Sequence, residues 1–259
     1  MIRLIREDLR LQIKGYRFWL SAFLCIVVAA LNLIENATYS RTLFDQDGLL
    51  IFLHATLLKR NLFLYFAPLI AALPFSTIPL EEIKHGFARQ QISRTGTKSY
   101  FASRIISAFL IGAFTVVAGL LMVLCLAIIF AKSGVHHYAT LNVGSPFSSV
   151  YKQFPIAYLA IFLVCSGVFG GVSSVLSAGI SLSTRSFYIG FLCPVLLYGL
   201  GTLAMGRLWT LDILPFSTFA ISTTTIPRLL RDQLSVFFVG IFLMLWSFWK
   251  WRKEACSWA

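Results

Sequence analysis

Residues 153–184 read QFPIAYLAIFLVCSGVFGGVSSVLSAGISLST and contain no Asp, Glu, Lys or Arg. Since an α-helix rises 1.5 Å per residue, ~20 apolar residues cross the ~30 Å hydrocarbon core of a bilayer. Further uncharged stretches with enough residues to cross are 18–34, 61–80, 105–131, 186–206 and 233–249. The pattern predicts an all-α, polytopic membrane protein with six transmembrane helices, forming a single domain over residues 1–259.

The overall composition agrees with a membrane protein. Of the 259 residues, 58% are hydrophobic and 12% are charged, whereas roughly 25% of the residues in an average soluble domain are charged. The net charge of +12 would suggest a nucleic-acid partner in a soluble protein. Here the basic residues lie between the apolar stretches, where they act as topology signals. We therefore expect membrane lipid around the chain and no nucleic-acid partner.

Two segments outside the six stretches are predicted to lie at the membrane surfaces. In residues 1–17, apolar side chains recur at spacings of three and four from Ile2 to Tyr16, with charged residues between them. This spacing predicts an amphipathic helix in the headgroup region. Residues 207–232 contain DILPFSTFAISTTTIPRLL, which is too short and too polar to cross. We expect an extracytoplasmic re-entrant or interfacial segment there, before the last helix.

The distribution of Lys and Arg predicts the orientation in the membrane. If the N-terminus is cytoplasmic, fourteen of the 22 basic residues fall on the cytoplasmic side and eight on the outer side. The positive-inside rule then predicts that both termini are cytoplasmic. The fourteen are Arg3, Arg6, Arg10, Lys14, Arg17, Lys84, Arg89, Arg94, Lys98, Arg104, Arg185, Lys250, Arg252 and Lys253.

The sequence lacks the signatures of several kinds of catalytic or cofactor site. No G-x-x-x-x-G-K-[ST] string is present, so the chain has no P-loop for a nucleotide. None of the four histidines has a zinc-ligand partner four residues further on. The interiors of the six stretches carry no charge that an ion-coupled transporter would use. We expect no catalytic, cofactor or metal site, and energy for any active transport would come from a partner.

The stretch 153–184 also carries a row of small residues that predicts close helix packing. The residues, at intervals of four, are Ser166, Gly170, Ser174 and Ala178. Small side chains let helix backbones approach closely in lipid, where van der Waals packing is a main attraction. The sequence leaves open whether this row packs within one subunit or between two subunits.

The predicted cytoplasmic loop, residues 81–104, reads EEIKHGFARQQISRTGTKSYFASR. It is compatible with a helix from Glu81 to Gln91 and with a break around Thr95 and Gly96. A helix of this kind can insert apolar residues such as Ile83 and Phe87 into the groove of a partner, while its charges fix the register at the rim.

The layout of the chain resembles that of the ABC type-2 exporter permeases of bacteria. The sharpest part of the resemblance runs from Phe75 to Arg104. It consists of an aromatic residue, an acidic residue, a glycine, two polar pairs and a basic residue, namely Phe75, Glu81 or Glu82, Gly86, Ser93-Arg94, Ser99-Tyr100 and Arg104.

The resemblance implies a membrane-spanning permease subunit in the bacterial inner membrane. In that family the cytoplasmic loop contains a coupling helix that binds a separate ABC ATPase subunit, and two permeases, identical or homologous, form the export path. The resemblance thus implies ATP hydrolysis in the partner and an amphipathic, lipid-like, peptide or drug-like substrate. The implied ATPase contacts are Glu81, Glu82, Ile83, Lys84, Gly86, Phe87, Arg89 and Arg94.

Two other classes of protein remain as alternatives. One is a polytopic immunity or scaffold protein that binds its ligand without moving it, and the other is a membrane enzyme without an ATPase partner. An enzyme would need a cluster of Asp, Glu or His at one depth in the membrane, which the sequence does not reveal. A binding protein would be favoured if no ATPase accompanied the chain.

Overall fold

The computed structural model describes residues 2–37, 51–52, 56, 62–130, 154–196 and 226–256. Helices and short turns make up this described part, and it contains no strand. The helices are α1 (Ile2–Lys14), α2 (Tyr16–Ala37), α4 (Leu62–Ala72), α5 (Ile78–Lys84), α6 (Phe87–Thr95), α7 (Thr97–Phe130), α9 (Pro155–Thr184) and α11 (Ile226–Cys256). A shorter apolar helix, Phe187–Leu196, follows α9.

Three helices in the described part are long and apolar enough to cross a membrane. These segments are Thr97–Ile129 of α7, Ile156–Thr184 of α9 and Leu234–Trp251 of α11. A fourth is added if Leu4–Lys14 and Tyr16–Asn32 count as one span bent by 57°. The chain is therefore a helical membrane protein, as its uncharged stretches predict. Most of the predicted re-entrant segment lies outside the described residues, and its end, residues 226–232, forms the first turns of α11.

Residues 61–80, predicted as one span, do not form a single helix. Its first part is α4, which ends at Ala72, and turns lead from there to α5, which begins at Ile78. Pro74 lies in the turns and Pro79 lies in the first turn of α5. Proline has no N–H and disfavours a helical conformation of the residue before it, so it ends one helix and is tolerated where the next begins.

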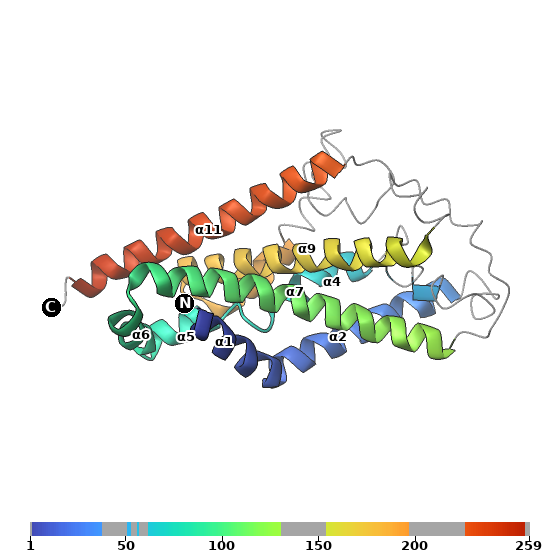
Figure 1. Ribbon diagram of the computed structural model, residues 1–259, viewed down its shortest axis with the longest axis horizontal. Helices are drawn as coiled ribbons and strands as arrows, with labels where there is room; N and C mark the ends of the chain where they lie inside the picture. Colours follow the sequence, from blue (N-terminus) through green and yellow to red (C-terminus); the bar gives the residue numbers. More distant parts are fainter. Residues whose placement is uncertain are drawn as a thin grey trace.

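The longest helices pack into one bundle (Figure 1). α9 contacts α7 and α11, and α2 packs against α7 and α4. One apolar cluster joins α2, α4, α7 and α9, with Cys25, Ile70, Leu120 and Phe162 among its buried members. A second joins α5, α7, α9 and α11 through residues such as Leu80, Ile111, Val175 and Met244.

Glycines set the close approach of α9 to its neighbours. A Cβ atom added to Gly112 of α7 would lie 2.5 Å from the Cβ of Ser174, and one added to Gly170 would lie 2.7 Å from the carbonyl oxygen of Gly112. On the other side, a Cβ on Gly179 would lie 2.7 Å from the carbonyl oxygen of Gly240 in α11. The close packing predicted for Gly170 and Ser174 thus occurs within the chain, against α7. Ser166 and Ala178, the other members of the predicted row, are buried as well.

The amphipathic N-terminal segment is helical as predicted, and one side of it packs on the bundle. α1 ends before Gly15, whose N–H donates to the carbonyl oxygen of Gln12, and α2 then leaves at a 57° bend. Leu9 packs against the apolar cluster that includes Leu80 and Met244. Leu11 and Ile13 are exposed, so apolar residues lie on more than one side of this helix.

Candidate functional site

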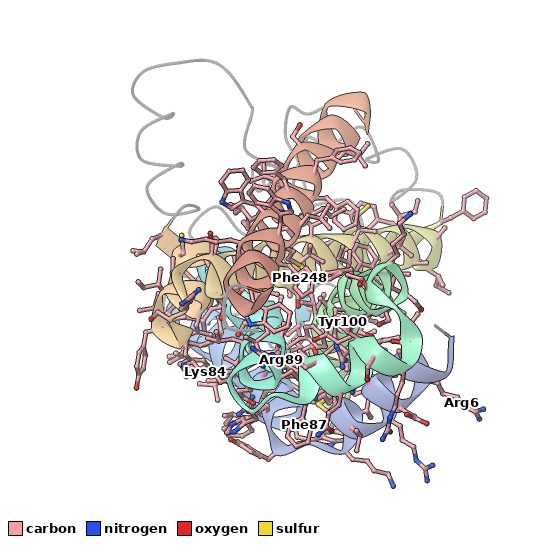
Figure 2. The ribbon with its side chains drawn as sticks, turned by 90° about the vertical axis from the view of Figure 1, so that its left-hand side faces the viewer. Arg6, Lys84, Phe87, Arg89, Tyr100 and Phe248 are labelled. Atoms are coloured by element: carbon pink, nitrogen blue, oxygen red, sulfur yellow. The ribbon has the colours of Figure 1, made fainter. Side chains whose placement is uncertain are left out.

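Several elements that are distant in sequence meet at one end of the bundle. In Figure 1, α1, α5, α6, the start of α7 and the end of α11 lie together at the end where both chain termini are marked. We call this the hairpin end, and we call α5 and α6 together, residues 78–95, the α5–α6 hairpin. Figure 2 looks onto this end, with Lys84, Phe87 and Arg89 of the hairpin and Arg6 of α1 in view.

The length of α7 puts the hairpin beyond the hydrocarbon of a bilayer. Residues 105–130 carry no charge and span about 39 Å at 1.5 Å per residue. Because ~30 Å is enough to cross the hydrocarbon, the charged first turns of α7, Thr97–Arg104, extend past it. The hairpin packs on these turns, because Tyr100 and Phe101 share an apolar cluster with Ala88 of α6.

The hairpin has two helices where the sequence predicts one helix from Glu81 to Gln91. The chain turns at Gly86, whose φ of +77° is left-handed, and α6 begins at Phe87. A left-handed conformation is accessible to glycine because it has no Cβ, and it is costly for most other residues. The break predicted around Thr95 and Gly96 is confirmed, because α6 ends before Gly96, which has a φ of +80°.

Arg104 of α7 ties three other helices to α7 at the hairpin end. Its side chain is 2% exposed and forms ion pairs with Asp8 of α1 and Glu82 of α5. Its Nη2 also donates to Oε1 of Gln91 in α6, at 2.7 Å. We call Arg104, Asp8, Glu82 and Gln91 the Arg104 cluster. Removing one partner of a buried ion pair typically costs 3–5 kcal/mol because it leaves a charge without its partner, so the arrangement of the four helices depends on every charged member of the cluster.

Two hydroxyl groups of α7 also donate hydrogen bonds to the carboxylates of the Arg104 cluster. Tyr100 donates to Oε2 of Glu82 at 2.7 Å, and Ser107 donates to Oδ2 of Asp8 at 2.9 Å. Burial raises the pKa of the Glu82 carboxyl above its ordinary value, while the charge of Arg104 and the hydrogen bond from Tyr100 act to lower it. The ionised form of Glu82 therefore depends on these two partners.

A second, more exposed ion pair joins α2 to the hairpin. Nη2 of Arg17 lies 3.1 Å from Oε1 of Glu81, and Nη1 of Arg17 donates to the hydroxyl of Thr77 at 2.7 Å. Because both charged side chains are partly exposed, this pair contributes less than the Arg104 cluster. It nevertheless pairs Glu81, the second acidic residue of α5, with a basic residue of the same chain.

An apolar cluster brings the end of α11 onto the hairpin. Phe248 is buried with Ala88, Tyr100 and Phe101, and Trp251 packs against the same group. Figure 2 shows Phe248 and Tyr100 close together at the centre of this end. The rings of Phe248 and Trp251 have their centroids 5.0 Å apart. The last span is therefore in direct contact with the elements that carry the hairpin.

The hairpin turns only part of its predicted contact surface outward. Phe87 is 57% exposed, and Lys84, Arg89 and Arg94 are also exposed. Glu82 lies inward on Arg104, and Ile83 packs against the apolar cluster of Ala88 and Tyr100. Glu82 and Ile83 therefore face the bundle in this structure, and their direct contact with a partner stays a prediction. Glu81 is engaged by Arg17, and Gly86 forms the turn between the helices.

The residues that hold the hairpin in place are largely absent from the predicted site. From the sequence, Arg104 is one of the fourteen cytoplasmic basic residues and the basic residue of the pattern that resembles the exporter permeases, whereas Asp8 and Phe248 receive no role. Asp8 is 96 residues away from Arg104 along the chain, so no local pattern connects them. The one local signal is the position of Arg104 itself, directly before a long uncharged stretch.

The described residues and the comparisons with other proteins give no further assignment. In the described part of the chain, no three His, Cys, Asp or Glu side chains come close enough to hold a metal ion. Comparisons with protein-family models, with characterised proteins and with solved structures return no match. The class that the fold defines is a helical membrane protein with a charged, extramembranous end.

Proposed function

We propose that this chain is the permease subunit of an ATP-driven ABC exporter in the bacterial inner membrane. The observation that carries the proposal is the exposed Phe87 on a hairpin that also exposes Lys84 and Arg89 and is anchored to the bundle. Aromatic residues and Arg are enriched at protein interfaces, where a few of them contribute most of the binding energy. The ATPase would be a separate subunit, because the sequence has no P-loop.

The orientation in this proposal follows from the gathering of basic residues at the hairpin end. α1, the hairpin, the start of α7 and the end of α11 together carry most of the basic residues assigned to the cytoplasmic side. The positive-inside rule supports a cytoplasmic hairpin end and cytoplasmic termini. The proposal retains six spans, of which the described helices account for three or four.

The Arg104 cluster provides a physical route from the hairpin to the spans. ATP-driven closure of two ATPase subunits would displace the hairpin. Because Arg104 joins α5 and α6 to α7 and α1, such a displacement would be passed to these helices rather than absorbed in the loop. Two such chains, identical or homologous, would form the path for an amphipathic, lipid-like, peptide or drug-like substrate.

Affinity purification from native membranes in mild detergent tests the proposal. We expect an ABC ATPase to accompany the chain in stoichiometric amount, identified by mass spectrometry and by ATP hydrolysis in the eluate. Phe87→Ala should reduce the bound ATPase at least about tenfold, as loss of a buried anchor does. Phe187→Ala removes another exposed phenylalanine outside the hairpin and serves as the matched control. An eluate without any ATPase, from correctly inserted wild-type protein, would contradict the proposal.

A further inference from the structure

In the hairpin and the following turns, the acidic residues form ion pairs within the chain, whereas four basic residues are exposed. Between Ile78 and Arg104 the acidic residues are Glu81 and Glu82. Arg17 pairs with Glu81, whose side chain is 46% exposed, and Arg104 pairs with Glu82, whose side chain is 16% exposed. Four other charged residues of the same segment are exposed and all four are basic, namely Lys84, Arg89, Arg94 and Lys98. The outward surface of the hairpin is therefore cationic although its sequence contains both signs.

The one large apolar side chain exposed on this surface is Phe87. The next residue, Ala88, is fully buried against Tyr100 and Phe101, which fixes the rotation of α6 about its axis. Phe87 is therefore held outward by the packing of its neighbour. Figure 2 shows Phe87 at the edge of the hairpin, with Lys84 and Arg89 on the same pair of helices.

Two occupants would suit a cationic surface with an aromatic residue: anionic lipid headgroups and an acidic protein groove. The uncharged residues 105–130 of α7 already span the hydrocarbon, so the hairpin lies past it. Other residues at this end suit the lipid headgroups, since Arg10 and Lys14 of α1 are exposed near the exposed Tyr16 and Trp19 of α2. Figure 1 shows α6 farther from the middle of the bundle than the bend between α1 and α2, where these anchors lie, and this position favours the protein groove.

We infer that the hairpin binds an apolar pocket rimmed by Asp and Glu side chains on the partner protein. This inference rests on the proposed function, in which the partner is the ATPase subunit, and it adds the chemistry of the contact. The pocket would receive Phe87, and its acidic rim would face Lys84 and Arg89. Pairing of Glu81 and Glu82 inside the chain removes the like-charge repulsion that these carboxylates would otherwise impose on such a rim.

Binding of the purified ATPase to the permease in nanodiscs tests the inference. We expect wild-type affinity to fall at least about tenfold between 50 and 500 mM NaCl, because salt screens exposed charge pairs. Lys84→Glu/Arg89→Glu should bind at least about tenfold more weakly at 50 mM NaCl, with a smaller salt dependence. The control Arg10→Glu/Lys14→Glu makes the same charge change on α1 and should bind like the wild type. Replacing acidic residues of the partner's groove by Lys should restore binding to Lys84→Glu/Arg89→Glu.

The outcomes separate the inference from the proposed function. If Lys84→Glu/Arg89→Glu binds the ATPase with wild-type affinity and wild-type salt dependence, the acidic rim is wrong and the ATPase partner stands. Equal weakening by the α1 control would also overturn the inference, because the effect would then reflect net charge rather than the hairpin. If no ATPase associates with the wild type, the proposed function fails first, and the inference fails with it.

Discussion

The side chain of Arg104 in α7 contacts residues of three other helices, α1, α5 and α6. It pairs with Asp8 and Glu82 and donates to Gln91 while being almost fully removed from solvent. Hydrogen bonds between charged groups contribute roughly 1.5–3 kcal/mol each, and an unpaired buried charge costs more than a missing contact. The position of the hairpin is therefore sensitive to this residue.

Arg104→Gln should lower the stability of the bundle by about 3–5 kcal/mol, because it leaves two carboxylates buried without their cation. The measurement is thermal or denaturant-induced unfolding of the purified protein in detergent. Arg94→Gln, at an exposed position of α6, should change the stability by less than ~1 kcal/mol.

The combined variant Arg104→Met/Asp8→Asn/Glu82→Gln provides the decisive control for this residue. Replacing all the charges of a buried network costs less than removing one partner. The combined variant should therefore be more stable than Arg104→Gln alone. If it is less stable, Arg104 acts mainly through its shape and not through its charge.

At the scale of elements, α7, α9 and α11 can be predicted from the sequence, because each contains a long uncharged stretch. Whether such a stretch can cross a membrane depends on its helical length relative to the thickness of the hydrocarbon core. The bend at Gly86 does not follow, since residues 81–91 fit one helix and the left-handed turn depends on packing of both halves against α7. The Arg104 cluster could not be predicted either. Its members come from four helices, and the pairing requires the complete bundle. The outward direction of Phe87 is likewise set by the burial of Ala88.

Gly170→Leu tests the contact between α7 and α9. A Cβ at this position would already lie 2.6 Å from Cγ2 of Val116, so a larger side chain forces the helices apart. Overpacking typically costs 1–3 kcal/mol, and more where the backbone cannot move. We expect a lower melting temperature in detergent and loss of a disulfide between cysteines introduced on the facing surfaces of α7 and α9. Val164→Leu adds volume at an exposed position of α9 and should have little effect.

At the scale of the whole molecule, the proposal requires the hairpin end to face the cytoplasm. Single cysteines at positions 98 and 142 in a cysteine-free background distinguish the two orientations. A membrane-impermeant maleimide applied to intact cells should label position 142 and leave position 98 unlabelled until the membrane is opened. Labelling of position 98 in intact cells would invert the orientation and remove the hairpin from any cytoplasmic ATPase.

The most direct test of the central claim is photocrosslinking from position 87 in intact cells. With p-benzoylphenylalanine in place of Phe87, the account predicts a covalent adduct between this chain and an ABC ATPase, identified by mass spectrometry. The same group in place of Phe187 should give no such adduct. If position 87 crosslinks only to lipid, or to no protein, while the chain is correctly inserted, the assignment of the hairpin as the ATPase-binding element is contradicted.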